Sequence, residues 1–190
     1  MFENYSLVQL GTDVGWMSVT ILAWTFMTYW LHRLSHVSHP KNPLWQLHRA
    51  HHRVAYLGEP TGSKIPKIGQ FFLWLGTWRA SLDVILAMTL PALAIAVLFP
   101  RYGIPLLVFH YFYEIFASEH ALDHNPQIKG RIVKYFAWGD FHLFHHMAPK
   151  NNFGLVITLW DRVFGTDVDP EPGTAQKRQS QLLDSRTKRI

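Results

Sequence analysis

The chain has 190 residues, which fits one domain, and 48% of them are hydrophobic while only 16% are charged. A typical soluble domain carries about 25% charged residues, so this composition favours a membrane protein. The sequence contains no Cys, which excludes disulfides, iron–sulfur clusters and thiolate metal ligands.

The apolar segments predict an all-α, integral-membrane fold. Residues 14–31 contain no charged residue for eighteen positions, close to the length that crosses a hydrocarbon core. Two further apolar runs, residues 84–99 and 104–117, are separated by a turn-like segment around Gly103. Residues 68–78 are apolar and aromatic but too short to cross, and they predict a helix that lies in the membrane interface or dips into it. We therefore expect about three transmembrane helices, this interfacial helix and a cytoplasmic histidine-rich helical cap.

The basic residues predict the orientation of these spans. If the N-terminus lies outside, all the histidine groups fall on the inner side, and only Arg101 of the 18 Lys and Arg residues lies outside. Such a bias marks the cytoplasmic side. The alternative is a soluble helical protein in which the apolar runs are core helices. We interpret residues 1–169 as one membrane domain and residues 170–190 as a polar, disordered tail.

Ten of the twelve histidines fall into four groups with helical spacing, two of the form HxxHH and two of the form HxxxH. Residues three or four apart share a helix face, so we expect each group to direct its imidazoles at one point. Neutral imidazole binds iron, copper, zinc and nickel, and ten imidazoles exceed the needs of one ion. This pattern predicts a two-metal site with the ligands His32, His36, His48, His51, His52, His120, His124, His142, His145 and His146.

Other ionisable residues are candidates to support this site. His39 lies outside the four groups and is expected to be dispensable. His110 and Glu114, four apart in the third apolar run, are expected either to line a substrate path or to form a self-satisfied polar pair. Arg79 and Asp83 predict an interfacial ion pair. A ligating imidazole usually donates the N–H of its other ring nitrogen to a carboxylate or carbonyl. The candidate carboxylates are Glu119, Asp123, Asp140 and Asp161. The alternative for each of them is a helix cap or an interfacial charge.

These motifs resemble those of the sterol desaturase and fatty acid hydroxylase superfamily of membrane-bound, histidine-rich di-iron enzymes. The resemblance rests on the histidine motifs at residues 32–36, 44–52 and 142–146 and on the closing stretches 152–154 and 159–166. It implies two iron ions, O2 as co-substrate and oxidation of a lipid-like C–H bond by hydroxylation or desaturation. Zinc is expected as a substitute in purified protein, because divalent affinities favour later first-row metals.

The resemblance also implies partners. The chain is short for the superfamily and shows no fused cytochrome or flavin domain, so we expect a separate ferredoxin or cytochrome-type electron donor. The other expected partners are a lipid-like substrate and the membrane, with no nucleic acid. One alternative is a metal-dependent hydrolase or isomerase that activates water with the same ligands. Another is a non-catalytic metal-binding or transport protein, which clustering of the ligands at one face disfavours.

Overall fold

The computed structural model describes residues 6–52 and 66–168, apart from the side chains of Glu119 and His120. The described residues form helices and turns, with one isolated β-bridge between Phe136 and Ile157. This agrees with the predicted all-α class. The predicted tail at residues 170–190 lies outside the described residues.

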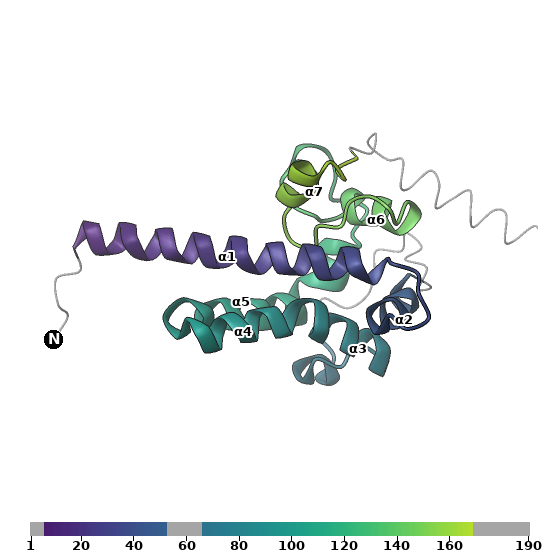
Figure 1. The fold of residues 1–190 in the computed structure, drawn as a ribbon, viewed down its shortest axis with the longest axis horizontal. Coiled ribbons are helices and arrows are strands. Elements are labelled where there is room, and N and C mark those ends of the chain that lie inside the picture. Colours follow the sequence, from purple (N-terminus) through teal and green to yellow (C-terminus); the bar gives the residue numbers. More distant parts are fainter. Residues whose placement is uncertain (1–5, 53–65, 169–190) are drawn as a thin grey trace, which may run out of the picture.

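The first long element is α1 (Leu7–Ser35), a helix of 29 residues. It begins at Ser6, whose hydroxyl accepts a hydrogen bond from Gln9 N while the Gln9 side chain accepts one from Ser6 N. This reciprocal capping box satisfies two backbone donors at the helix start. The N-terminal part of α1 extends past the other helices in Figure 1, and its length and hydropathy are sufficient to cross a membrane.

The second long element is a continuous helix, Trp78–Leu98, which is also long and apolar enough to cross. It consists of α3 (Trp78–Val84), the π-helical turn η2 (Ile85–Thr89) and α4 (Leu90–Leu98). Pro91 lacks an N–H and cannot complete regular α-helical bonding, and the π-helical turn ends at Thr89, shortly before it. Single π-helical turns are rare in proteins, and those that occur are often found at functional sites.

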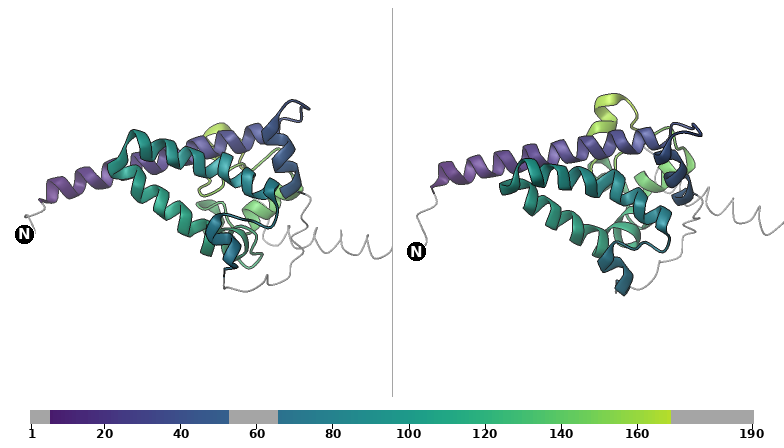
Figure 2. Two further views of the ribbon diagram at one scale, coloured as in Figure 1. Left: turned by 90° about the horizontal axis from the view of Figure 1, so that it is seen from below. Right: turned by 60° about the horizontal axis from the view of Figure 1, so that its bottom comes forward.

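Helix α5 (Pro100–Phe116) returns antiparallel to α4, as Figures 1 and 2 show. The two helices approach closely at Gly103, where a Cβ atom would overlap the backbone of Ala96. With 17 residues, α5 is shorter than the two candidate spans of the described residues. The first two predicted spans are therefore supported, and the third stays a prediction.

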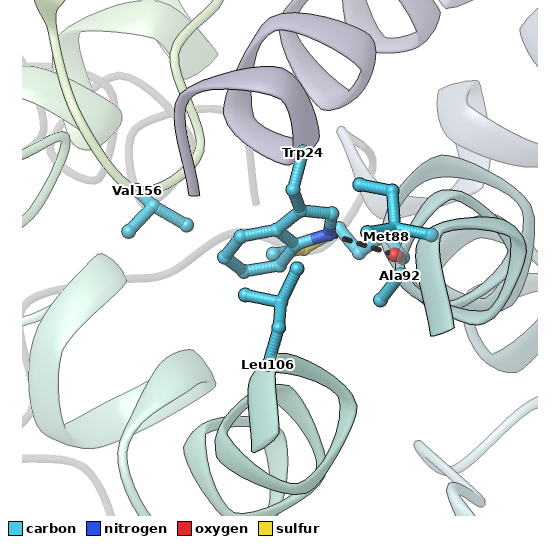
Figure 3. Close-up of a cluster of buried hydrophobic side chains, with 6 residues drawn as sticks. Trp24, Met88, Ala92, Leu106 and Val156 are labelled. Carbon is cyan, nitrogen blue, oxygen red and sulfur yellow. Dashed lines mark hydrogen bonds between the residues drawn. The ribbon is translucent and has the colours of Figure 1, made fainter. Parts of the chain in front are cut away.

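The apolar core joins α1 to this hairpin. Trp24 is fully buried and packs with Met88, Ala92, Leu106 and Val156 (Figure 3). Its indole Nε1 donates a hydrogen bond of 3.0 Å to the Met88 carbonyl, which lies in the π-helical turn. Other apolar side chains of the helices are exposed, among them Leu93, Val97, Val108 and Phe112. Apolar surface of this kind is typical of a membrane contact.

The predicted interfacial helix at residues 68–78 is shorter than expected. The 3-10 helix η1 covers only Ile68–Phe72, because Leu73 adopts a left-handed conformation with φ of 54° and Gly76 follows with φ of 85°. These residues turn the chain, and α3 then starts after Thr77, whose hydroxyl caps Ala80 N. The exposed side chains of Ile68 and Phe72 fit an interfacial position.

Short elements gather around the C-terminal end of α1 (Figures 1 and 2). The last of these elements, α7 (Leu159–Phe164), packs on α1 through aromatic rings: Phe164 stacks on Tyr29, and Trp160 contacts Phe26. The Tyr29 hydroxyl also lies 2.9 Å from Thr166 Oγ1. These elements are α2 (Pro43–His51), η3 (Ser118–Asp123), η4 (Gly130–Lys134), α6 (Asp140–Met147) and α7 (Leu159–Phe164).

Candidate metal centre

Nine of the ten predicted ligands come together in two groups whose nitrogen atoms lie within 4.8 Å of one another in each group. They reach this point from α1, α2, α6 and the end of η3, elements far apart in the sequence. We call them the five-histidine group and the four-histidine group. The first contains His32, His36, His48, His52 and His145, and the second contains His51, His124, His142 and His146.

Each HxxHH motif supplies both groups. In the first motif, His48 and His52 belong to the five-histidine group and His51 to the other. In the second motif, His145 crosses to the five-histidine group. The expectation that each motif directs all its imidazoles at one point was therefore wrong. Adjacent side chains on a helix with 3.6 residues per turn point about 100° apart, so both cannot face one ion.

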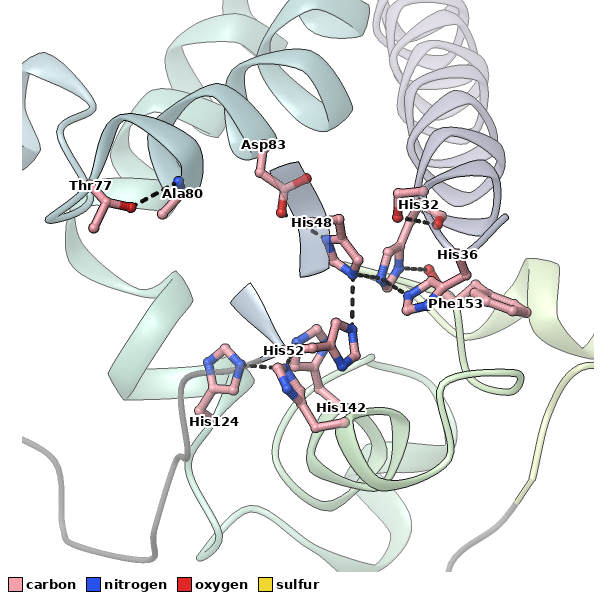
Figure 4. A network of polar contacts seen from close by, with 12 residues as sticks. His32, His36, His48, His52, Thr77, Ala80, Asp83, His124, His142 and Phe153 are labelled. Atoms are coloured by element: carbon pink, nitrogen blue, oxygen red, sulfur yellow. Dashed lines mark hydrogen bonds and ion pairs between the residues drawn. The ribbon is translucent and has the colours of Figure 1, made fainter. Parts of the chain in front are cut away.

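Three members of the five-histidine group have their Nδ1 atoms held by oxygen acceptors. His32 Nδ1 donates to the Phe153 carbonyl and His145 Nδ1 to the Asn151 carbonyl, both at 2.7 Å. His48 Nδ1 donates to Asp83 Oδ2 at 2.8 Å (Figure 4). Each contact fixes the tautomer with hydrogen on Nδ1 and leaves the Nε2 lone pair for a ligand.

These lone pairs face one another. His48 Nε2 lies 3.1 Å from His32 Nε2 and 3.0 Å from His52 Nε2. Because the ring hydrogens of His32 and His48 are donated elsewhere, two lone pairs would oppose each other without a cation between them. Two nitrogens bound to one ion at about 2.1 Å are about 3.0 Å apart when the angle at the ion is a right angle. The buried His145 Nε2, which has no hydrogen-bond partner in the described residues, is a further donor atom. The group therefore fits a metal ion.

The four-histidine group has similar spacing. His146 Nε2 lies 3.0 Å from His124 Nε2 and 3.3 Å from His142 Nε2. The two groups adjoin, since the rings of His52 and His146 are 4.4 Å apart between centroids. The tenth predicted ligand, His120, has its side chain outside the described residues and stays a prediction.

The surroundings keep these imidazoles neutral. Burial, together with the neighbouring His32 and His52, lowers the pKa of His36 from 6.5 to about 2. Burial lowers the pKa of His52 to about 4. Burial and neighbouring histidines also lower the pKa values of five others well below 6.5, and neutral imidazole is the metal-binding form. These five are His48, His51, His142, His145 and His146.

Asp83, for which the i, i+4 spacing predicted an ion pair with Arg79, contacts the predicted ligand His48 instead. That prediction was wrong: Asp83 accepts from His48, while the Arg79 guanidinium lies over the Trp78 ring at 5.1 Å. Asp83 is 35 residues from His48 in sequence, so no local spacing indicated the contact.

The four predicted supporting carboxylates have different surroundings. Asp161 accepts hydrogen bonds from the backbone N–H groups of Phe153 and Gly154, and so supports the carbonyl that holds His32. Asp123 accepts from the Tyr113 and Ser118 hydroxyls, next to the predicted ligand His124. Asp140 is buried in the first turn of α6, and the Glu119 side chain lies outside the described residues.

The ionisable pair of the third apolar run faces the interior, as expected for such residues in an apolar segment. His110 and Glu114 are 1% and 3% exposed, with 3.8 Å between His110 Nδ1 and Glu114 Oε1. His110 Nε2 lies 2.9 Å from Thr89 Oγ1, at the end of the π-helical turn, and its ring packs beside Trp24. His39, in contrast, is exposed and belongs to neither histidine group.

This arrangement is that of a helical protein with two adjacent histidine groups, each of which could hold a metal ion, beside apolar helices. The chain belongs to the fatty acid hydroxylase family, whose sequence model matches residues 17–166. The resemblance inferred from the histidine motifs is therefore confirmed.

Individual relatives agree with this family. Alkylglycerol monooxygenase from Xenopus tropicalis is 24% identical over 88% of this chain and 34% of its own length. Dihydroceramide fatty acyl 2-hydroxylase from Arabidopsis thaliana is 30% identical over 86% of this chain and 64% of its own length. Methylsterol monooxygenase 1 from Gallus gallus is 47% identical over 19% of this chain and 12% of its own length. The chain thus spans less than two thirds of each of these relatives, and no solved structure matches it.

Proposed function

We propose that this chain is the catalytic part of a membrane-bound di-iron oxygenase that hydroxylates, or desaturates, a C–H bond of a lipid or other long apolar substrate. The observation that carries the proposal is the convergence of nine histidines into two groups beside apolar helices. The names of the relatives support it, because they are monooxygenases and a hydroxylase of lipids.

The histidines would hold two iron ions, with His120 as a tenth ligand beside its neighbour His124. When bound, the ions would supply the activation of O2, with electrons from an outside donor. The chain's own contribution is to keep the imidazoles neutral and oriented. The Phe153 and Asn151 carbonyls do this for His32 and His145.

The apolar helices would admit the substrate from the bilayer. Leu93, Val97 and Phe112 expose apolar surface on α4 and α5. His110 and Glu114 face the interior of the same bundle, where polar side chains tend to line a cavity or pathway. We assign them to the substrate path.

The metal centre would lie on the cytoplasmic side and receive electrons from a small acidic ferredoxin or cytochrome-type carrier. Basic side chains close to the ligands in sequence support this orientation and this partner. Arg49 lies on α2 between His48 and His51, and is exposed above the Trp45 ring at 4.8 Å. Further basic residues near the histidine groups in sequence are Arg53, Lys129, Arg131, Lys134 and Lys150.

Oxygen consumption tests this function. Detergent-purified protein would be loaded with Fe²⁺ without air, reduced, and mixed with oxygen and candidate lipids such as alkylglycerols, ceramides or sterols. We expect O2 uptake that requires reductant and lipid, about two ions per chain, and hydroxylated or desaturated product by mass spectrometry. His142→Ala should abolish turnover, whereas His39→Ala should not. Lipid conversion without O2 or reductant would instead support a hydrolase or isomerase, and full occupancy by one ion would contradict the two-metal site.

A further inference from the structure

The structure singles out one carboxylate beside the metal centre. Asp83 is 8% exposed and His48 is 5% exposed, and the two meet at 2.8 Å. Within the described residues, this is the only polar contact of the Asp83 side chain. A buried carboxylate without a hydrogen-bond partner would strongly destabilise the fold, and the contact with His48 offsets this cost of burying Asp83.

Asp83 contacts the His48 ring from the side that faces away from the other histidines of the group. It lies on α3, near the start of the helix Trp78–Leu98, and α3 packs against α2, which carries His48. Figure 4 shows Asp83 on the side of the His48 ring opposite to His32 and His52. The carboxylate therefore holds Nδ1 from outside while Nε2 points into the five-histidine group.

We propose that Asp83 is a positioning residue that fixes His48 and thereby sets the metal affinity of the five-histidine group, and not that of the four-histidine group. The inference rests on the proposed metal function. An acceptor on Nδ1 selects the tautomer, orients the ring and raises its basicity as a ligand. The two other fixed Nδ1 atoms of this group are held by neutral carbonyls, so Asp83 supplies its carboxylate anchor.

The test is a set of Co²⁺ titrations followed by visible absorbance, on detergent-purified, metal-free full-length protein. Asp83→Ala should weaken one of the two binding steps about 10–100-fold, the usual effect of losing such a partner. Asp83→Asn keeps an acceptor oxygen for the Nδ1 hydrogen and should weaken it less. Asp13→Asn is the matched control: it removes a carboxylate that contacts Arg101 and Tyr102 at the other end of the bundle.

A double-variant comparison separates positioning from a general loss of structure. If Asp83 acts through His48, the variant with both His48→Ala and Asp83→Ala should bind Co²⁺ no more weakly than His48→Ala alone. The effects of Asp83→Ala and His142→Ala should instead add, because His142 belongs to the other group. Additive losses with His48, or equal weakening of both steps, would overturn the inference. Absence of Co²⁺ binding to the wild-type protein would contradict the proposed metal function itself.

Discussion

The loop that holds His32 depends on one buried carboxylate, so Asp161→Asn should destabilise the whole centre. Asp161 accepts three hydrogen bonds of 2.7 Å, from Phe153 N, Gly154 N and Thr166 Oγ1, and these occupy both carboxylate oxygens. An Asn side chain offers one acceptor oxygen, and its NH2 group would face a backbone N–H. One buried donor is then unsatisfied, at a cost of about 1–3 kcal/mol, and the remaining bonds lose about 1 kcal/mol each because the acceptor is neutral.

The expected loss is therefore about 3–5 kcal/mol in the free energy of unfolding, which lowers Tm by about 6–20 °C for a chain of this size. Thermal unfolding in detergent, at a fixed scan rate and without metal, measures it. Asp167→Asn is the control, because its 3.4 Å contact with Arg162 is partly exposed and contributes at most about 1 kcal/mol. A Tm for Asp161→Asn within about 2 °C of the wild type would refute this account of the loop.

Three further outcomes follow from the structure. Because burial lowers the pKa of His52 from 6.5 to about 4, the unfolded chain binds more protons than the folded one in that range. The Tm of metal-free protein should therefore fall as the pH is lowered from about 6.5 to 4; a rise over this range would contradict the sign. His39→Ala should retain two ions by elemental analysis, and loss of one would show a wrong ligand set. Gly139, at the start of α6, has φ of 53°, and a Cβ atom there would collide with the Ile128 carbonyl. Gly139→Ala should therefore lower Tm, and an unchanged Tm would contradict this prediction.

Which histidines share a helix face could be predicted from the sequence, because their spacing is a local property of a helix. His32 and His36, or His142 and His146, are four residues apart and meet one position wherever their helix lies. The grouping of residues across helices is a tertiary property. That His145 joins His32, while His142 does not, depends on how α6 is turned toward α1, and the sequence carries no short-range signal of that rotation.

The errors in the fold have the same origin. Asp83 was paired with Arg79 because the two are four apart, but packing of α3 against α2 brings His48 to the carboxylate instead. The predicted interfacial helix continued through Leu73, where no Gly or Pro marked an end, and the left-handed backbone of this residue ended it. Long apolar segments could be predicted more readily, because the length of a hydrophobic run without charges can be counted directly in the sequence.

The crossing of the two HxxHH motifs has a consequence for folding. His32 and His145 are more than a hundred residues apart in the chain, yet they belong to the same group. An ion bound by both would act as a cross-link between the ends of this segment. Closing a loop of about 100 residues removes conformational entropy from the unfolded chain worth about 5 kcal/mol in a covalent cross-link. Because His51 joins His142 in the other group, a second ion would close a second loop nested within the first. The metal ions would thus act as two cross-links, closing nested loops, between the first and last thirds of the chain.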